Sequence, residues 1–379
     1  MFYYPRILTD QVLEYLTAGK VILIVGARRV GKTVLISRIT EKIHEETLLL
    51  NGEDFTTKEL LQGQRIEQYR SFLSNKTVLI IDEAQKVDNI GQIVKLMIDH
   101  IHNLKIILTD SSALNLGDRF GEALTGRKIT LQLFPLSIQE FKQFENDLQI
   151  SDHLEERLIF GSYPEVWQTN DRSKRIGYLK ELANDYLFRD ILQLENIRNA
   201  SKLQDLLRLM SFQIGKEVSN EELGRQLGMS KKTVERYLDF LSKVFIIFRV
   251  QGFSRNLRKE VTKNHRWYFY DNGIRNVFAV NFDTVRMRQD TGQIWENFII
   301  SERIKFLSYN RDYGNIYFWR TYDKQEIDWV EERDGRLYGY EIKWGKKKEK
   351  CPASWRKSYP EARFSVIHPE NYLEWLTIA

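Results

Sequence analysis

Val21-Ile22-Leu23-Ile24-Val25-Gly26-Ala27-Arg28-Arg29-Val30-Gly31-Lys32-Thr33-Val34 is the stretch that decides the fold of this 379-residue chain. Its apolar first half predicts a buried parallel strand. The pattern G-x-x-x-x-G-K-T that follows predicts a loop whose backbone N–H groups converge on the phosphates of a nucleotide. The residues expected to bind ATP are Gly26, Ala27, Arg28, Arg29, Val30, Gly31, Lys32, Thr33 and Val34.

Two side chains of this loop carry specific expectations. Lys32 places a positive charge near the β- and γ-phosphates, and the Thr33 hydroxyl is a ligand for Mg²⁺. The apolar spacing of the next residues predicts a helix whose N-terminus also attracts the anion. The alternative is a glycine turn beside a chance lysine, which the strand before it and the helix after it disfavour.

A second apolar run, Val78–Ile81, ends in two adjacent carboxylates, Asp82 and Glu83. Ligands of open α/β sheets bind at the carboxyl ends of the strands. We therefore expect Asp82 to hold Mg²⁺ and Glu83 to orient or deprotonate the attacking water, because phosphoryl transfer depends mainly on positioning and charge neutralisation. Two solvated acids at a strand end are the alternative.

Further strands are expected at 47–51, 104–109 and 128–133, with helical stretches such as 93–101 between them. This alternation predicts an α/β fold with a parallel sheet covered by helices on both faces. We place the ATPase core at 1–135. The mainly helical pattern of 136–198 predicts a lid or connector, interrupted by a turn at 161–164.

Residues 199–275 are predicted to form a winged helix-turn-helix. Ser219 and Ser230 are placed to cap two short helices, the second with Val234, Leu238 and Leu241 inward. Its outward residues Lys231, Lys232 and Arg236, with a basic wing at 255–259, predict DNA binding. The segment 198–266 holds 15 Lys and Arg against 7 Asp and Glu. A basic helical module that binds another protein is the alternative.

In the last segment, 276–379, a helix near 292–300 precedes strands near 316–319, 326–333 and 336–344. Asp334-Gly335 predicts a two-residue hairpin turn. If Arg333 pairs with Arg336, then Trp329 lies opposite Tyr340, and Ile327 opposite Ile342 on the same apolar face. The polar face then gathers Glu326, Asp328, Glu341 and Lys343.

Asp328 opposite Glu341 is the informative pair, because two facing carboxylates repel unless a divalent cation lies between them. Glu296, on the packed side of its helix, is a third candidate ligand. Lys343 would position a nucleophile or stabilise developing charge, so the cluster predicts metal-assisted phosphodiester hydrolysis with Glu341 and Lys343 as catalytic residues. A solvated polar face of an amphipathic hairpin is the alternative.

These motifs together resemble a large group of bacterial and archaeal AAA-like P-loop ATPases. The similar segments are 26–33, 81–85, 124–127, 134–137, 161–165, the helix-turn-helix and 269–273. The resemblance implies an ATPase core, a winged helix and a C-terminal domain similar to PD-(D/E)XK restriction endonucleases. Asp328 with Glu341-Ile342-Lys343 matches the D…E-x-K motif, and Glu296 matches the helix glutamate.

The same resemblance implies that Arg127 contacts the γ-phosphate, within the chain or across a subunit contact. The group usually has Thr-Gly-Ser-Ser after the fourth strand, where this chain has Thr109-Asp110-Ser111-Ser112. Asp110 near a triphosphate is an unfavourable like charge unless it faces away. A homo-oligomer is left open.

Composition sets the expected compartment. The chain has one cysteine, Cys351, a net charge of +5 and no signal pattern, and its uncharged apolar runs are too short to span a bilayer. We expect a cytoplasmic, ATP- and Mg²⁺-dependent ATPase that binds DNA and carries a nuclease-like domain. The alternative is an ATP-switched regulatory scaffold with a protein-binding winged helix and an inactive nuclease-like domain.

Overall fold

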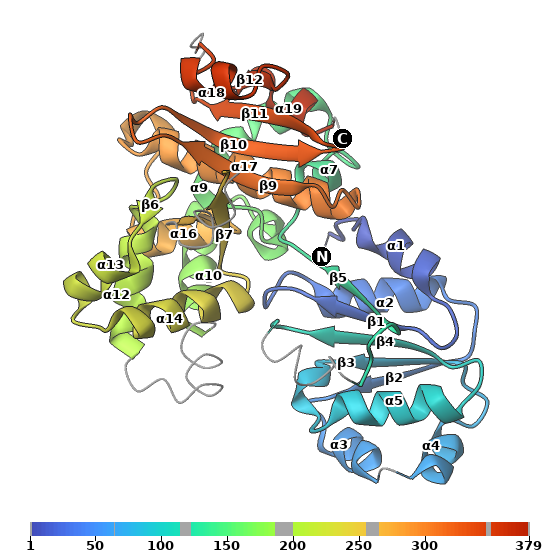
Figure 1. Ribbon diagram of the computed structural model, residues 1–379. Coiled ribbons are helices and arrows are strands. Elements are labelled where there is room, and N and C mark those ends of the chain that lie inside the picture. The colour runs from blue at the N-terminus through green and yellow to red at the C-terminus, as the bar shows by residue number, and fades with distance from the viewer. Residues whose placement is uncertain are drawn as a thin grey trace. The chain divides into compact units, whose positions relative to one another are not determined.

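The computed structural model describes residues 2–63, 65–113, 123–185, 200–254, 265–345 and 350–377. The chain divides into two compact units, described separately below. The N-terminal unit comprises 5–134 and 243–245, and the C-terminal unit comprises 1–4, 135–242 and 246–379. Figure 1 labels the elements of both.

The N-terminal unit is built on five parallel strands in the order β2-β3-β4-β1-β5. They are β1 (Val21–Val25), β2 (Thr47–Asn51), β3 (Val78–Asp82), β4 (Lys105–Asp110) and β5 (Lys128–Gln132). The helices are α1 (Leu8–Tyr15), α2 (Lys32–Lys42), α3 (Phe55–Gln62), α4 (Ile66–Leu73), the 3₁₀ turn η1 (Ala84–Lys86) and α5 (Ile90–His100). In Figure 1, α2 and α5 lie on opposite faces of the sheet. The five strands and the parallel sheet expected from the sequence are therefore confirmed.

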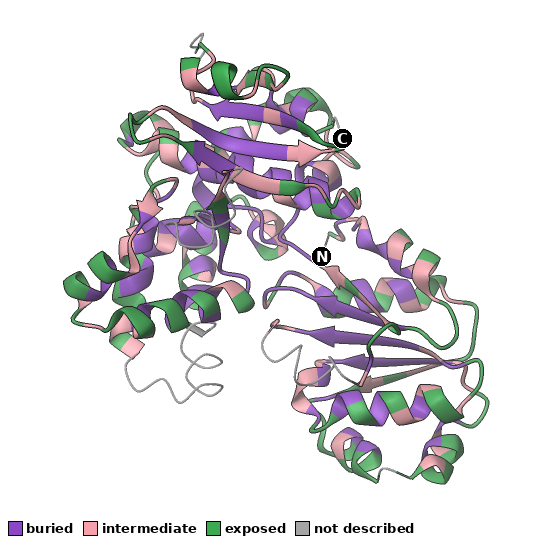
Figure 2. Cartoon of the chain, in the orientation of Figure 1, coloured by how far each residue is buried: buried purple, intermediate pink, exposed green. Residues whose placement is uncertain are grey.

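The order of the strands explains how the site forms. Strands β1, β3 and β4 are almost entirely buried, which their unbroken Val, Ile and Leu runs require (Figure 2). Strand β4 lies between β1, which leads into the phosphate loop, and β3, which ends at Asp82. The end of β4 therefore separates the loop from the two acids.

The helical first part of the C-terminal unit contains α7 (Ile138–Phe141), α8 (Asp147–Asp152), α9 (Leu154–Phe160), the turn η2 (Pro164–Gln168) and α10 (Arg172–Asp185). Next come α12 (Ala200–Ser211), β6 (Glu217–Val218), α13 (Asn220–Leu227), α14 (Lys231–Lys243), β7 (Ile247–Gly252) and β8 (His265–Phe269). The last part contains α16 (Asn272–Ala279), η4 (Val285–Met287), α17 (Thr291–Tyr309), β9 (Asn315–Arg320), β10 (Glu326–Arg333), β11 (Arg336–Ile342), α18 (Ala353–Ser358), β12 (Arg363–Ile367) and α19 (Tyr372–Trp375).

One sheet runs through the predicted winged-helix and nuclease-like segments, in the order β12-β11-β10-β9-β7-β8-β6. Its two halves meet where β7 pairs with β9, Gln251 with Tyr317 and Gly252 with Phe318. The segments predicted after residue 135 thus share one compact unit.

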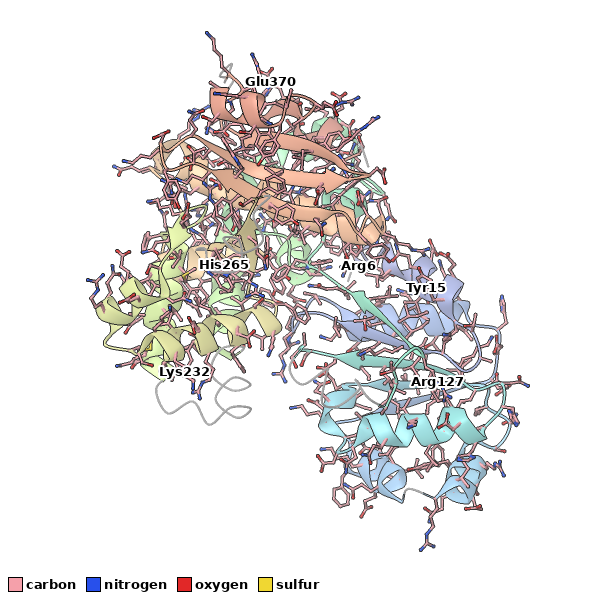
Figure 3. All side chains as sticks on the ribbon, viewed as in Figure 1. Arg6, Tyr15, Arg127, Lys232, His265 and Glu370 are labelled. Carbon is pink, nitrogen blue, oxygen red and sulfur yellow. The ribbon has the colours of Figure 1, made fainter. Side chains whose placement is uncertain are left out.

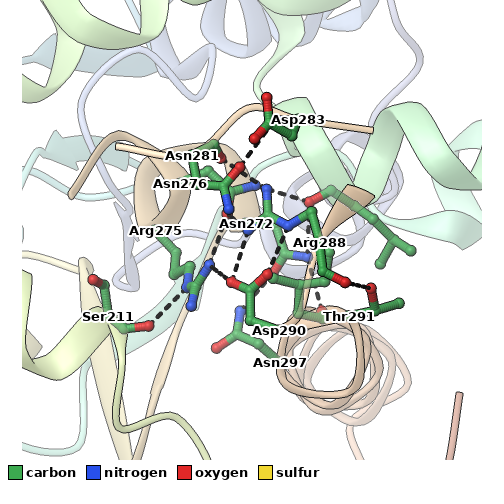
Figure 4. A network of polar contacts seen from close by, with 12 residues as sticks. Ser211, Asn272, Arg275, Asn276, Asn281, Asp283, Arg288, Asp290, Thr291 and Asn297 are labelled. Carbon is green, nitrogen blue, oxygen red and sulfur yellow. Dashed lines mark hydrogen bonds and ion pairs between the residues drawn. The ribbon is translucent and has the colours of Figure 1, made fainter. Parts of the chain in front are cut away.

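A buried polar network joins α9, α16 and α17 inside this unit (Figure 4). Asn276 donates to the carbonyl oxygens of Leu158 and Ile159, in the last turn of α9. Arg275 and Arg288 both pair with Asp290, just before α17. Because buried polar groups must be hydrogen-bonded, this network fixes how the three helices pack.

The predicted hairpin register is confirmed from Trp329–Tyr340 to Arg333–Arg336. Beyond Trp329 the predicted pairs of β10 with β11, including Asp328 opposite Glu341, are not part of the ladder. In the same region the pairing of β10 with β9 shifts between Ile327 and Val330. Ile327 therefore packs with Val330, Leu337 and Trp355. It does not share the face of Trp329, so the expected clean division into an apolar and a polar face is wrong at this end of the hairpin.

Candidate functional site

The phosphate loop follows β1 directly and is shaped by two glycines. Gly31 has φ 99°, a left-handed conformation that only glycine adopts without strain, and α2 begins at the next residue. A Cβ atom on Gly26 would lie 2.2 Å from the Leu133 carbonyl oxygen, so the loop packs against the end of β5 too closely for any side chain. Both glycines of the G-x-x-x-x-G-K-T pattern thus have a steric role.

Lys32 is buried inside this loop. Its Nζ atom donates to the carbonyl oxygens of Gly26 and Ala27, at 2.9 and 3.1 Å. Burial lowers the pKa of Lys32, and the charges of Glu83, Asp110 and Asp82 oppose this effect. The positive charge of Lys32 therefore interacts with these acids, and it is placed to attract the phosphates of a bound nucleotide.

The sequence singled out Thr33 and Asp82, and the structure brings them together. Thr33 Oγ1 donates to Asp82 Oδ2 at 2.7 Å. Thr109, on β4, donates to the other carboxylate oxygen at 2.5 Å and accepts a hydrogen bond from the Glu83 backbone N–H at 2.8 Å. Thr109 thus positions both acids, a role that sequence analysis did not foresee because strand order was unknown.

Glu83 is partly exposed, in a left-handed backbone conformation with φ 50°. Its carboxylate accepts a hydrogen bond from Gln85 Nε2 at 2.5 Å, and the same amide reaches Ser111 Oγ at 2.9 Å. A non-glycine residue in this region of φ is uncommon and points to a constraint at the site.

Asp110, at the end of β4, is fully buried, and its Oδ1 atom accepts hydrogen bonds from Ser112 N and Oγ.

Arg6 is a further residue of the site that the sequence analysis missed (Figure 3). It is 6% exposed, and its guanidinium donates to the carbonyl oxygens of Val30, in the loop, and Phe134, after β5. The arginine therefore braces the phosphate loop. No local pattern marks it, because its partners lie 24 and 128 residues away.

The structure corrects the prediction that Arg127 contacts the γ-phosphate within the same chain. It precedes β5 at the edge where β1 begins, since Val21 pairs with Lys128, whereas the phosphate loop follows the other end of β1. The two ends of a five-residue strand lie roughly 13–17 Å apart. Arg127 instead pairs with Asp99 of α5. Contact with the γ-phosphate of the same chain is therefore excluded, and only the contact across subunits stays a prediction.

A second acidic centre lies in the C-terminal unit. It contains Asp328 from β10, whose charge acts on Glu296 from α17 and on Glu341 from β11. Burial first, and then the charge of Asp328, raises the pKa of Glu296 to about 8 and that of Glu341 to about 7. Lys343 Nζ lies 2.5 Å from Glu341 Oε1 and 3.9 Å from Asp328 Oδ2.

Two residues of β8, which the sequence analysis did not place here, complete this centre. The Arg266 guanidinium lies 2.7 Å from Glu326 Oε2 and 3.2 Å from Asp328 Oδ1. The Tyr268 hydroxyl donates to Glu296 Oε1 at 2.9 Å. Among the described residues, no three His, Cys, Asp or Glu side chains are grouped closely enough to hold a metal ion.

Helix α14 presents the basic face that the sequence predicted. Val234, Leu238 and Leu241 are buried, whereas Lys231, Lys232 and Arg236 are exposed. Ser219 and Ser230 accept hydrogen bonds from Glu222 N and Thr233 N, so both predicted N-caps are confirmed. Figure 3 shows Lys232 extending from the helix. The predicted basic wing at 255–259 lies outside the described residues.

Comparison with protein families divides the chain into three parts. Residues 18–142 match the AAA domain family. Residues 151–284 and 291–373 match two domains of unknown function, DUF8612 and DUF4143. The first match and the geometry above show that the N-terminal unit has an AAA-type P-loop fold. None of the described helices is both long and apolar enough to cross a membrane.

Similar proteins occur in bacteria and archaea. An uncharacterized protein of Methanocaldococcus jannaschii, MJ1544, is 26% identical over 78% of this chain and 69% of its own length. An uncharacterized protein of Haemophilus influenzae is 23% identical over 87% and 84%. The Walker-type ATPase PABY2304 of Pyrococcus abyssi, a solved structure, is 16% identical over 73% of this chain and 96% of its own, with a TM-score of 0.48. The fold assignment rests on the loop and sheet geometry and the AAA domain match.

Proposed function

We propose that the N-terminal unit binds ATP with Mg²⁺ and hydrolyses it. The observation that carries this proposal is the convergence of Lys32, Thr33, Asp82 and Glu83 at one edge of the sheet, with Thr109 linking the two acids. A hydroxyl and a carboxylate oxygen 2.7 Å apart form a donor set that suits Mg²⁺. When bound, the ion would neutralise charge on the phosphates.

Each residue then has a distinct role in the proposed reaction. The Lys32 ammonium exchanges loop carbonyls for phosphate oxygens, and its burial strengthens that attraction. Thr33 and Asp82 hold the metal. Glu83 orients the attacking water and accepts its proton, with Gln85 holding the carboxylate.

Steady-state ATP hydrolysis by Lys32→Ala tests this proposal. We expect a loss of about 100-fold or more, as is typical when a charge-stabilising group is removed. Lys42→Ala is the matched control, because this exposed lysine lies on the same helix and pairs with Asp10. Wild-type protein that binds ATP without hydrolysing it would instead favour a nucleotide-controlled switch.

We further propose that the segment 199–275 is a winged helix that binds DNA through Lys231, Lys232 and Arg236. The exposed basic face of α14 supports this proposal. Substituting all three by alanine should weaken DNA binding and reduce the salt dependence, by about 0.9 in log–log slope for each lost phosphate contact. Arg356→Ala with Lys357→Ala, exposed on α18, is the matched control. Absence of DNA affinity at low salt would favour a protein-binding module.

For the C-terminal domain we propose a nuclease-like centre whose metal ligands are Glu296, Asp328 and Glu341, with Glu341 and Lys343 as its catalytic residues. The proximity of Lys343 to Glu341 and the effect of the Asp328 charge on both glutamates support this proposal. In the described structure the three acids are not grouped closely enough to hold a metal ion together, so binding would have to draw them closer. When bound, a divalent metal would polarise a phosphodiester and lower the pKa of a bound water. DNA cleavage dependent on Mg²⁺ or Mn²⁺ should be lost in both Glu341→Ala and Lys343→Ala.

One observation favours the second candidate, a regulatory scaffold with an inactive centre. Arg266 already supplies a positive charge to the acids that a metal would need. In this case ATP still acts on the N-terminal unit, and no variant of Glu341 or Lys343 changes the nuclease signal. Cleavage that both substitutions abolish decides for the nuclease.

A further inference from the structure

The geometry points to Arg266 as the resident cation of the C-terminal acidic centre, holding its carboxylates in the place of a divalent metal and keeping metal affinity low. This inference rests on the second candidate function above, in which the C-terminal centre is inactive, and names the residue that keeps it inactive. Metal binding would then require the removal or displacement of one guanidinium.

Arg266 is fixed where it lies. It is 2% exposed, and its guanidinium stacks on the Phe318 ring at 4.7 Å. Its backbone lies in the interior strand β8, paired with Glu217 on one side and Val250 on the other. Burial and the aromatic contact therefore hold the guanidinium beside the acids.

The guanidinium engages the acid on which the proposed metal centre depends most. Asp328 Oδ1 lies 3.2 Å from Arg266, and Asp328 Oδ2 accepts the Ile342 backbone N–H at 3.0 Å. Both oxygens of this carboxylate therefore face N–H donors. Glu326, on the same strand, is bound to the second guanidinium nitrogen at 2.7 Å.

The other two acids of the centre are held by Lys343 and Tyr268. Glu341 Oε1 pairs with Lys343, whereas Glu341 Oε2 is buried and has no hydrogen-bond partner among the described residues. Glu296 is held by Tyr268 and lies so close to Gly215 that a Cβ atom there would be 2.3 Å from its Oε1 atom. Removal of Arg266 would take one positive charge from Asp328 and Glu326 and leave Lys343 beside Glu341 and Asp328.

Mn²⁺ binding to the full-length protein without nucleotide tests the inference, measured by electron paramagnetic resonance of free Mn²⁺. We compare the wild type with Arg266→Gln, which removes the charge, and with Arg266→Lys, which keeps it. Arg266→Gln should gain a site at least about tenfold tighter than any in the wild type, because one unit of repelling charge is removed at short range. Arg266→Lys should bind like the wild type. Adding Asp328→Asn to Arg266→Gln should abolish the gained site.

A second comparison, of the wild type with Asp328→Asn, covers the case in which Arg266→Gln does not fold. Asp328→Asn alone should leave the Mn²⁺ titration unchanged, because the arginine already neutralises this acid. A wild-type site that disappears in Asp328→Asn overturns the inference about Arg266 and leaves the metal centre standing. Absence of any Mn²⁺ site in folded Arg266→Gln overturns both.

Discussion

The two acidic centres of this molecule hold their carboxylates in different ways. At the phosphate loop, Asp82 is bound by the hydroxyls of Thr33 and Thr109, and Glu83 by the amide of Gln85. In the C-terminal unit, Arg266 and Lys343 bind the acids as cations. A neutral donor orients a carboxylate and leaves its charge for a metal, whereas a cation orients it and neutralises it. This difference suits the proposed Mg²⁺ at the first centre, whereas the acids of the second centre already face two cations.

The largest effect that would sharpen this comparison concerns Glu83. Glu83→Gln should lower the rate of ATP hydrolysis by about 100-fold while nucleotide affinity stays within a few-fold, because it removes the base and keeps the fold. The measurement is single-turnover hydrolysis beside a fluorescent-nucleotide titration. Glu341→Gln is the control and should leave both values unchanged. Equal losses in the two variants would erase the distinction between the centres.

A smaller effect is expected at the neutral donor Thr109. Thr109→Val keeps the shape of the side chain and removes the hydroxyl that holds Asp82 and the Glu83 backbone. We expect kcat for ATP to fall about tenfold with little change in KM, because positioning of the acids matters most in the transition state. Thr40→Val, on α2, is the control for loss of a hydroxyl. A change in KM alone would place Thr109 in nucleotide binding instead.

The third prediction concerns pH and the C-terminal centre. Burial and the charge of Asp328 raise the pKa of Glu296 from 4.5 to about 8, so the folded protein holds a proton that the unfolded chain releases. This contribution to the free energy of unfolding is complete below about pH 4.5 and is lost as the pH rises toward 8. Glu296→Gln should remove most of that fall, a few kcal/mol at most between pH 5 and 8.

Urea unfolding between pH 5 and 8, with a chelator present, measures this effect. Glu332→Gln is the reference, because Glu332 lies on β10, the strand that carries Asp328, but outside the cluster. If the free energies of unfolding of wild type and Glu296→Gln fall in parallel from pH 5 to 8, Glu296 is ionised over that whole range. The described effect of burial and Asp328 on its pKa would then be wrong.

The smallest effect is expected for Arg127. At concentrations where the protein is monomeric, Arg127→Ala should change ATP hydrolysis by less than about twofold, because its side chain pairs with Asp99 at the far edge of the sheet. The rate is then measured again at high protein concentration. A loss that occurs only there would support the contact across subunits, and a loss in the dilute protein would contradict the placement of Arg127.

The sequence was most informative where local patterns determine structure. The runs ending at Gly26 and Asp82 identified two strands and the ligands that follow them, and Asp334-Gly335 set the hairpin register. Local patterns do not contain strand order, so Thr109 was not recognised as the link between β1 and β3. The register shift before Val330 also has no signal in the turn that starts the pairing.

Arg266 shows the same limit over a longer range. It reaches Asp328 across 62 residues, and only because the two halves of the sheet meet at Gly252 and Phe318. From the sequence, carboxylates at positions 328 and 341 predict a bound metal ion, because like charges close together must be compensated. Repulsion predicts that some cation is present, but not which one.

Arg6 has a practical consequence for work with this protein. Terminal residues are often removed or fused to tags on the assumption that they are dispensable. Here the sixth residue grips the backbone of the nucleotide loop at Val30 and the chain leaving β5 at Phe134. A shortened version starting at Leu8 would keep every residue of the G-x-x-x-x-G-K-T signature but lose the hydrogen bonds from Arg6 to the loop. A low rate of ATP hydrolysis measured on that version would then be attributed wrongly to the protein that contains Arg6.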